Sequence, residues 1–219
     1  MSLVPSVTET LLAWGITPVA CTRFCEQPRL PHVGGTKDPD VAAITDLAPD
    51  LVVVDEEENR REDHDALVAA GLAVHVLAVR DLAHLDAAMT DLAAAVGARW
   101  DPVGDRPEPA PSRSAWVPIW KRPWMALGEP TYGSAVLRAL GIANVAAADG
   151  AYPEVDPSDA AARGADLVIA PSEPYPFAER HRGELEGAAP DVRFVDGRDL
   201  LWWGVRTAAA LDRLRDALA

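Results

Sequence analysis

The sequence predicts an α/β fold with two Rossmann-like lobes, each built on a parallel sheet, and three observations support this prediction. A set of four elements occurs once in each half of the 219 residues. Strands alternate with helices along the chain, which is typical of parallel sheets. A Pro-rich stretch separates the two halves. Since two similar lobes leave a crevice between them, a ligand site is expected there.

The repeated set consists of a helix ended by Gly-Ile, a helix after Asp-Pro, an Asp-Leu-Val strand and a polar loop. Its first copy runs from Gly15 to Glu57 and its second from Gly141 to Glu173. Any single element would be ordinary in an α/β protein. Four matched elements in the same order favour a duplicated architecture.

Caps and periodicity define the elements of the first half. Ser6 and Glu9 have the spacing of a capping box, and Gly15 ends that helix. Asp38 is expected to cap the second helix, with Pro39 at its first position. The expected order is a helix up to Gly15, a strand at 19–21, a helix after Asp38, a strand at 51–54, a helix at 65–70, a strand at 74–79 and an amphipathic helix at 81–96.

The linker and the second half follow. Residues 98–114 contain four prolines, which indicates a locally stiff linker. The predicted domains are therefore an N-terminal lobe at 1–80, a connecting helix and Pro-rich linker at 81–114, and a C-terminal lobe at 115–219. The elements expected in this lobe are a strand at 116–119, a helix ending at Leu140, a helix after Asp156, a strand at 167–170, a helix at 178–186, a strand at 192–195 and a helix at 207–218.

Composition excludes several classes of partner. The net charge of −14 and the pI of about 4.7 disfavour nucleic acid and anionic membrane surfaces. No apolar run is long enough for a membrane-spanning helix, so no membrane insertion is expected. The first residues lack a basic region, an apolar region and a lipid-attachment cysteine. This predicts a cytoplasmic location as written, or an extracytoplasmic one if the true start lies upstream.

Aromatic residues gather in the second half, mostly in loops that follow strands. Such loops edge the ligand crevice of parallel α/β lobes, and broad rings there suit a flat or large apolar ligand. Core packing is the alternative interpretation. The predicted apolar walls are Trp120, Trp124, Tyr132, Tyr175 and Trp202.

The first half offers Phe24, Lys37 and Asn59 as ligand-binding candidates. Lys37 could pair with an anionic group of a ligand, although a solvated lysine is equally consistent with the sequence. Asn59 lies in an acidic loop that could bind a cation but lacks calcium-loop spacing, so a solvated helix start is favoured. Two cysteines and scattered histidines predict no metal site. No nucleophile or acid–base set has recognisable spacing, so no catalytic residue is predicted and the chain is not expected to be an enzyme.

Motifs along nearly the whole chain resemble one superfamily. They are SLVPSVTETL at 2–11, RFC at 23–25, VGGTKDPD at 33–40, PDLV at 49–52, EENR at 57–60, PIWKRPWM at 118–125, YPEV at 152–155, EPYPF at 173–177 and WGVRT at 203–207. Together they resemble the periplasmic-binding-protein-like helical-backbone metal receptors. The likeness is greatest to the cobalamin-binding substrate-binding proteins of ABC importers, including their short, leaderless members.

The resemblance implies a non-enzymatic binding protein that needs no cofactor. Its expected ligand is a corrinoid first and another metal chelate, such as an iron–siderophore, second. An ABC permease is the implied partner, yet Ala42 and Ser158 stand where the resemblance would place the docking glutamates. The linker also replaces a helix expected before Trp116. The alternative is a cytoplasmic relative that has lost import and acts as a corrinoid-handling or protein-interaction module.

Overall fold

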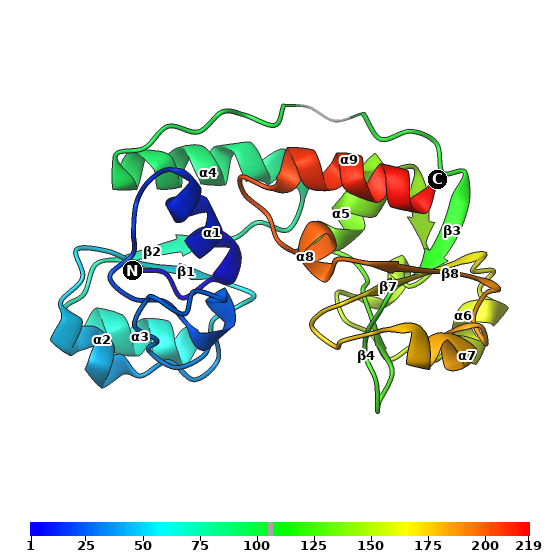
Figure 1. The fold of residues 1–219 in the computed structure, drawn as a ribbon, viewed down its shortest axis with the longest axis horizontal. Coiled ribbons are helices and arrows are strands. Elements are labelled where there is room, and N and C mark those ends of the chain that lie inside the picture. The colour runs from blue at the N-terminus through cyan, green and yellow to red at the C-terminus, as the bar shows by residue number, and fades with distance from the viewer. Residues whose placement is uncertain (105–106) are drawn as a thin grey trace. The chain divides into compact units, whose positions relative to one another are not determined.

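The computed structural model describes residues 1–104 and 107–219, so residues 105–106 of the predicted linker lie outside the described residues (Figure 1). The chain divides into two compact units. Unit 1 comprises Met1–Val79, Leu85–Pro102 and Trp203–Val205, and unit 2 comprises Arg80–His84, Val103–Trp202 and Arg206–Ala219. Each unit is α/β with parallel strand pairing, which confirms the predicted fold class. The domain boundaries predicted at residues 80 and 114 stay a prediction.

Unit 1 is built on two parallel strands. They are β1 (Val52–Asp55) and β2 (Val74–Leu77), in register from Val52 opposite Val74 to Asp55 opposite Leu77. All four residues of β1 are buried, as its apolar run predicts. The helical elements are α1 (Pro5–Ala13), η1 (Arg23–Cys25), α2 (Val41–Leu47), α3 (Arg61–Ala69) and most of α4 (Leu82–Val96).

A late segment of the chain completes unit 1. The backbone N–H of Val205 donates to Thr10 Oγ1 at 3.3 Å. Gly204 has φ +116°, and a Cβ on it would lie 2.3 Å from the same oxygen. Only glycine fits at this position, because it tolerates positive φ and has no Cβ that would collide with the Thr10 oxygen.

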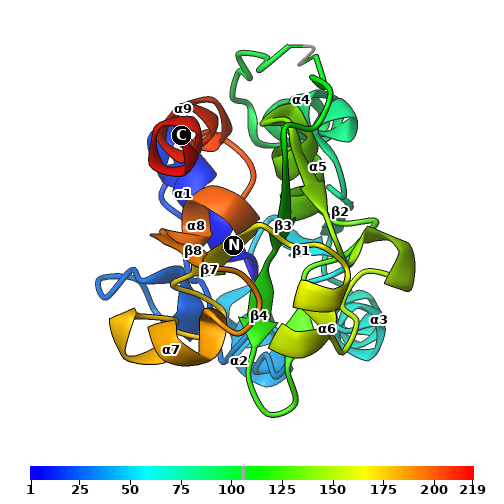
Figure 2. The ribbon, with the colours of Figure 1, turned by 90° about the vertical axis from the view of Figure 1, so that its right-hand side faces the viewer.

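Unit 2 has a parallel sheet in the order β6-β3-β7-β8. Its strands are β3 (Arg113–Trp116), β6 (Ile142–Asn144), β7 (Leu167–Pro171) and β8 (Asp191–Val195), and an antiparallel hairpin pairs β4 (Pro118–Trp120) with β5 (Met125–Ala126). The helical elements are α5 (Tyr132–Ala139), η2 (Ala147–Asp149), α6 (Pro157–Ala162), η3 (Glu179–His181), α7 (Arg182–Leu185), α8 (Gly197–Leu201) and α9 (Thr207–Leu218). Helix α5 packs against β6, α8 against β7 and α9 against β8 (Figure 2).

Two predicted caps of unit 1 are wrong. Helix α2 begins at Val41, and Asp40 caps it by accepting from the N–H of Ala43 at 3.0 Å. Asp38 instead forms an ion pair with Arg23. Helix α1 already begins at Pro5, whose fixed φ suits the first helical position, so Ser6 lies inside the helix and caps nothing.

The second Asp-Pro pair behaves as predicted. Asp156 caps α6 by accepting from the N–H of Asp159 at 2.9 Å, and Pro157 opens the helix. The two copies of the repeated set therefore differ at this element.

Some strand and helix predictions also need correction. Residues 19–21 form no strand; Cys21 makes only an isolated bridge with His32. The strand expected at 116–119 is interrupted at Val117 and becomes β3 and β4. Residues 178–186 form the short η3 and α7 rather than one helix. The last helix occupies 207–218 as predicted, and among the described residues no helix has the length and apolarity needed to cross a bilayer.

Cys21 and Cys25 are buried free thiols of unit 1, and burial together with the Cys25 thiol raises the pKa of Cys21 to about 12. Thiolates, not thiols, attack disulfides. Because both thiols are buried and the Cys21 thiol stays protonated at pH 8, we expect neither cysteine to react with an aromatic disulfide reagent at that pH in the native protein, and both to react in guanidinium. Rapid colour development from the folded protein would contradict this arrangement.

Candidate functional site

Unit 2 contains a connected group of rings, here called the aromatic cluster: Trp116, Trp120, Trp124, Tyr175 and Phe177. Trp124 stacks on Phe177 with ring centroids 6.0 Å apart and planes 5° apart. Tyr175 lies 4.7 Å from Phe177 and meets Trp120 edge to face at 5.7 Å. Such pairs hold one another in fixed orientations. The cluster is thus a preorganised aromatic surface.

Strand topology explains why these rings meet. Trp116 ends β3, and the hairpin that carries Trp120 and Trp124 follows directly. Tyr175 and Phe177 lie in the loop after β7. Because β3 and β7 are parallel neighbours, their carboxyl ends lie at the same edge of the sheet. The fold therefore brings the two loops together.

The aromatic cluster runs from the core to the surface. Trp116 and Phe177 are buried within the main apolar core of unit 2, and Trp124 and Tyr175 pack against that core. Trp120 at the far end is 46% exposed. The inner rings therefore stabilise the fold, whereas Trp120 presents apolar area to the solvent.

A buried histidine lies beneath these rings. His181 has its ring 5.5 Å from Tyr175 and 5.7 Å from Phe177. Its Nδ1 accepts from the N–H of Ala178 at 3.2 Å, which places the proton of the neutral ring on Nε2. Burial lowers its pKa, and Arg180 and Lys121 lower it further. In this tautomer the Nε2–H group of the ring is a hydrogen-bond donor.

A hydrogen-bonded group of polar residues lies at the carboxyl end of β1 in unit 1. Asn59 Oδ1 accepts from the N–H of Asp55 at 2.9 Å, and its Nδ2 donates to the carbonyls of Thr36 and Leu3. Asn59 is buried, and these bonds engage its amide. It therefore positions the loop that holds Thr36. Its predicted contact with a ligand stays a prediction.

Asp55 beside it has an unusual environment. Its Oδ1 accepts from the backbone N–H groups of Glu57 and Glu58, while its buried Oδ2 has no hydrogen-bond partner among the described residues. Burial raises the pKa of Asp55 to about 6, although the two backbone hydrogen bonds partly offset the effect. This carboxyl group gains a proton on mild acidification.

Phe24 and Lys37 lie on the surface of unit 1. Phe24 is 51% exposed, with the guanidinium of Arg23 4.8 Å from its ring centroid. Lys37 Nζ donates to the carbonyl of Glu57. Gly35 permits the Arg23–Asp38 ion pair, since a Cβ there would lie 2.3 Å from the Asp38 carboxylate. Both candidates are accessible, and their role in binding stays a prediction.

Two predicted wall residues of unit 2 lie outside the aromatic cluster. Tyr132 is buried in α5, and its hydroxyl lies 2.9 Å from Thr207 Oγ1. Its predicted place on a ligand wall stays a prediction. Trp202 is half-buried after α8, where the guanidinium of Arg206 covers its ring at 5.3 Å. The predicted wall omitted Trp116, Phe177 and His181. These residues lie at or after the ends of the adjacent parallel strands β3 and β7. That position is the signal that could have identified them from the sequence.

The described residues offer no resident metal centre. Among them, no group of three or more His, Cys, Asp or Glu side chains could hold a metal ion.

No family model matches the sequence, and no curated protein matches it closely. Solved structures do. The periplasmic heme-binding protein BhuT, solved with two hemes, has 22% identity and a TM-score of 0.78, over 100% of this chain and 98% of its own. A periplasmic heme-binding protein from Pseudomonas aeruginosa has 21% identity and a TM-score of 0.80, and the match covers 99% of this chain and 90% of that protein. The periplasmic vitamin B12-binding protein BtuF of Vibrio cholerae has 17% identity and a TM-score of 0.75, and the match covers 99% of this chain and 94% of BtuF.

These neighbours confirm the resemblance seen in the sequence at the level of fold. The chain has the fold of these periplasmic heme- and vitamin B12-binding proteins.

Proposed function

We propose that this chain, which has the fold of periplasmic heme- and vitamin B12-binding proteins, is a non-enzymatic solute-binding protein for a planar metal chelate of the tetrapyrrole class. The observation that supports this most directly is the aromatic cluster of unit 2. Its exposed end, Trp120 beside Tyr175, presents ring surface at the carboxyl edge of a parallel sheet. Heme and corrinoids both belong to the proposed ligand class.

The physical reason is the shape of the ligand. A flat macrocycle covers an indole face and gains roughly 25 cal/mol for each Å² of apolar surface removed from water. Fixed rings add affinity because little side-chain freedom is lost on binding. Trp120 is held edge to face against Tyr175, which in turn contacts Phe177. These contacts therefore fix the orientation of the rings before a ligand binds.

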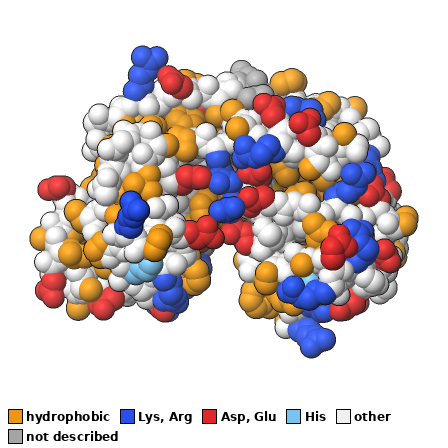
Figure 3. All heavy atoms as spheres, in the orientation of Figure 1, with side chains coloured by type: hydrophobic (Ala, Val, Ile, Leu, Met, Phe, Trp, Pro, Cys, Tyr) orange, Lys and Arg blue, Asp and Glu red, His pale blue; other side chains and the backbone are white. Residues whose placement is uncertain are grey.

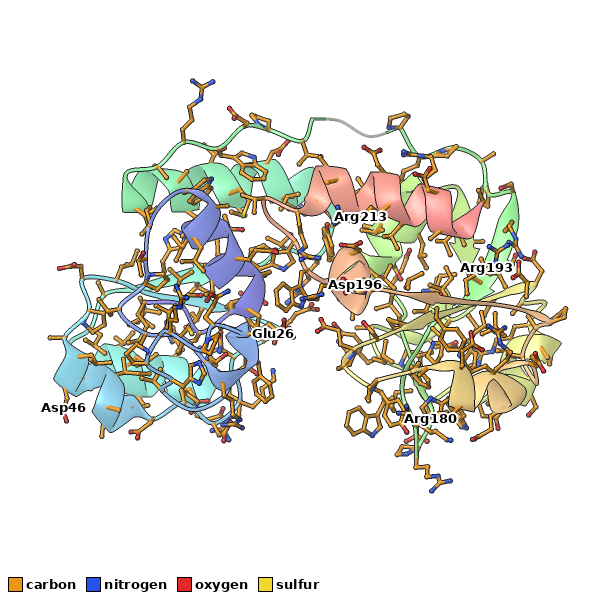
Figure 4. The ribbon with its side chains drawn as sticks, viewed as in Figure 1. Glu26, Asp46, Arg180, Arg193, Asp196 and Arg213 are labelled. Carbon is orange, nitrogen blue, oxygen red and sulfur yellow. The ribbon has the colours of Figure 1, made fainter. Side chains whose placement is uncertain are left out.

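An ABC permease is the proposed partner. Ala42 and Ser158, which stand in place of the expected docking glutamates, are exposed on α2 and α6. Each of these helices also carries an exposed carboxylate, Asp46 on α2 (Figure 4) and Asp159 on α6. We propose that these two aspartates supply the negative charge that a basic permease surface would bind.

A titration tests the proposed ligand class. Heme, cobalamin, cobinamide and a ferric siderophore are added in turn while tryptophan fluorescence and visible absorbance are recorded. We expect saturable quenching and a shifted absorption band with at least one macrocycle, at micromolar affinity or better. A response to none of the four would remove the proposed function, and the aromatic cluster would then serve packing alone.

Trp120→Ala is expected to weaken macrocycle binding by at least about tenfold, since one exposed indole face contributes on the order of 1–3 kcal/mol. The free energy of unfolding should change by less than about 1 kcal/mol because Trp120 lies outside the core. Tyr152→Ala is the matched control: Tyr152 is 44% exposed in unit 2 and outside the aromatic cluster. Equal affinities for the two variants would exclude Trp120 from the site.

A further inference from the structure

The two cysteines of unit 1 lie at the two ends of one tight turn. Cys21 makes the isolated bridge with His32. Cys25 ends η1, where its backbone N–H donates to the carbonyl of Thr22 at 3.1 Å. Glu26, the next residue, has φ +53° in the left-handed region and is exposed (Figure 4). Backbone contacts therefore hold both cysteines in place.

The two thiols meet inside unit 1. Cys21 and Cys25 are buried, and the Cys25 thiol hydrogen-bonds to the Cys21 thiol. Thr8 Oγ1 donates to Cys25 Sγ at 3.3 Å, and Thr22 Oγ1 lies 3.2 Å from the same sulfur. Sulfur is a weak acceptor, so these hydroxyl groups can still donate to it after the thiol hydrogen is lost. The surroundings of Cys25 therefore tolerate the loss of that hydrogen.

The outer side of the turn lies at the surface. Phe24 is 51% exposed, and Arg23 lies over its ring and pairs with Asp38 at 2.9 Å. Figure 3 shows hydrophobic, basic and acidic side chains intermixed on the face of unit 1 that it presents. Because the thiols themselves are buried, a reagent in solvent meets the outer side chains of the turn and not the sulfur atoms.

We infer that Cys21 and Cys25 are a redox modification site, at which a low-molecular-weight disulfide such as glutathione disulfide joins them into one intramolecular disulfide while the turn is unfolded. Folding then buries the bond. The two side chains already touch in the native fold, so a disulfide needs only a short approach of the sulfur atoms. This site lies in unit 1, apart from the aromatic cluster of unit 2, and it requires no bound ligand.

The exchange has two steps. One cysteine thiolate attacks a sulfur of glutathione disulfide, breaks its S–S bond and releases one glutathione thiolate. The other cysteine thiolate attacks the mixed disulfide at the protein sulfur and releases the second glutathione thiolate. This second step is intramolecular, which favours it over further reaction with glutathione. The cysteines lose two protons and two electrons, and glutathione disulfide becomes two glutathione molecules.

Folding determines when this exchange takes place. In the unfolded chain a cysteine thiol has a pKa of about 8.5, so thiolate is present near neutral pH. In the native fold burial and the neighbouring thiol raise the pKa of Cys21 to about 12, and solvent does not reach the sulfur atoms. The same burial excludes thiol reductants. The native protein therefore keeps the oxidation state that the pair had when the chain folded.

Refolding in two redox buffers tests this inference. The full chain is unfolded in guanidinium and refolded at pH 8 with glutathione disulfide or with dithiothreitol, and free thiols are then alkylated. Trypsin cuts after Arg23, between the cysteines, so a disulfide holds peptide 1–23 to peptide 24–29 until it is reduced. We expect the linked peptides only after oxidative refolding. Native reduced protein incubated with glutathione disulfide should give none.

The bridged protein should keep the native circular dichroism spectrum. Its unfolding equilibrium constant should be roughly 10- to 30-fold lower than that of the reduced protein, because the five-residue ring 21–25 restricts the unfolded chain. Cys25→Ser is the matched control: one thiol remains, so the variant should unfold alike after both refolding conditions. Cell-free synthesis in the same two buffers makes the same comparison during the first folding of the chain.

Three results would overturn the inference. The first is free thiols or separate glutathione adducts on both cysteines after oxidative refolding. The second is a bridged protein that unfolds more easily than the reduced protein, since the bond would then not fit the native turn. The third is oxidation of the native protein as fast as that of the unfolded chain. None of these results bears on the proposed function, which the macrocycle titration tests separately.

Discussion

Asp199→Asn is expected to lower the free energy of unfolding by about 3–5 kcal/mol, because it removes a buried negative charge that two guanidinium groups share. Asp199 is 8% exposed at its side chain and accepts from Arg206 at 2.8 Å and from Arg213 at 2.6 and 2.7 Å. The side chain of Arg206 is only 13% exposed. Arg213 on α9 (Figure 4) thereby ties that helix to α8. Chemical denaturation at pH 7 measures the loss.

Asp212→Asn on α9 is the matched control for this experiment. Its partner is Arg215 at 2.8 Å, and both side chains are more than half exposed. Exposed pairs of this kind contribute about 0–1 kcal/mol. A loss for Asp199→Asn as small as that of Asp212→Asn would show that the buried pair does not hold α8 and α9 together.

The second large effect concerns Asp55, whose pKa of about 6 lies above the value of 3.8 for a free aspartate. Between these two values the folded state binds more protons than the unfolded state, so stability falls as pH rises through the window. Below pH 4 the group contributes nothing, and above pH 6 it costs about 3 kcal/mol. Asp55→Asn resembles the protonated form. Its stability relative to the parent protein should rise by about 3 kcal/mol from pH 4 to pH 7.

Denaturation curves at several pH values measure this difference. Asp46→Asn, an exposed change on α2, is the control for the removal of a carboxylate from unit 1. If the difference in free energy of unfolding between Asp55→Asn and the parent protein did not vary with pH, the Asp55 carboxyl group would be hydrated in solution.

The sequence predicted the elements whose signal is local and strong. The apolar runs at 51–54 and 167–170 became β1 and β7, and Asp156-Pro157 opened α6. Predictions failed where a tertiary partner competed for the same group. Asp38 has the sequence of a cap, but Arg23, fifteen residues earlier, binds its carboxylate.

The candidate site was also predicted only in part, because contacts between residues distant in the sequence decide which rings meet. Trp120, Trp124 and Tyr175 were identified from aromatic residues in loops after strands, and the structure brings these three together with Phe177. Tyr132 has the same local signal but points to Thr207, 75 residues away. Depth in the core depends on such distant partners, which periodicity does not encode.

The contact between Thr10 and Val205 has a consequence for biosynthesis. Unit 1 takes its other residues from the first 102 of the chain, so about 100 residues must be translated before Trp203–Val205 can join it. A ribosome that adds about 5–20 residues per second needs roughly 5–20 s for that stretch. During this interval the part of unit 1 that is already made lacks Trp203–Val205, and Thr10 stays uncovered.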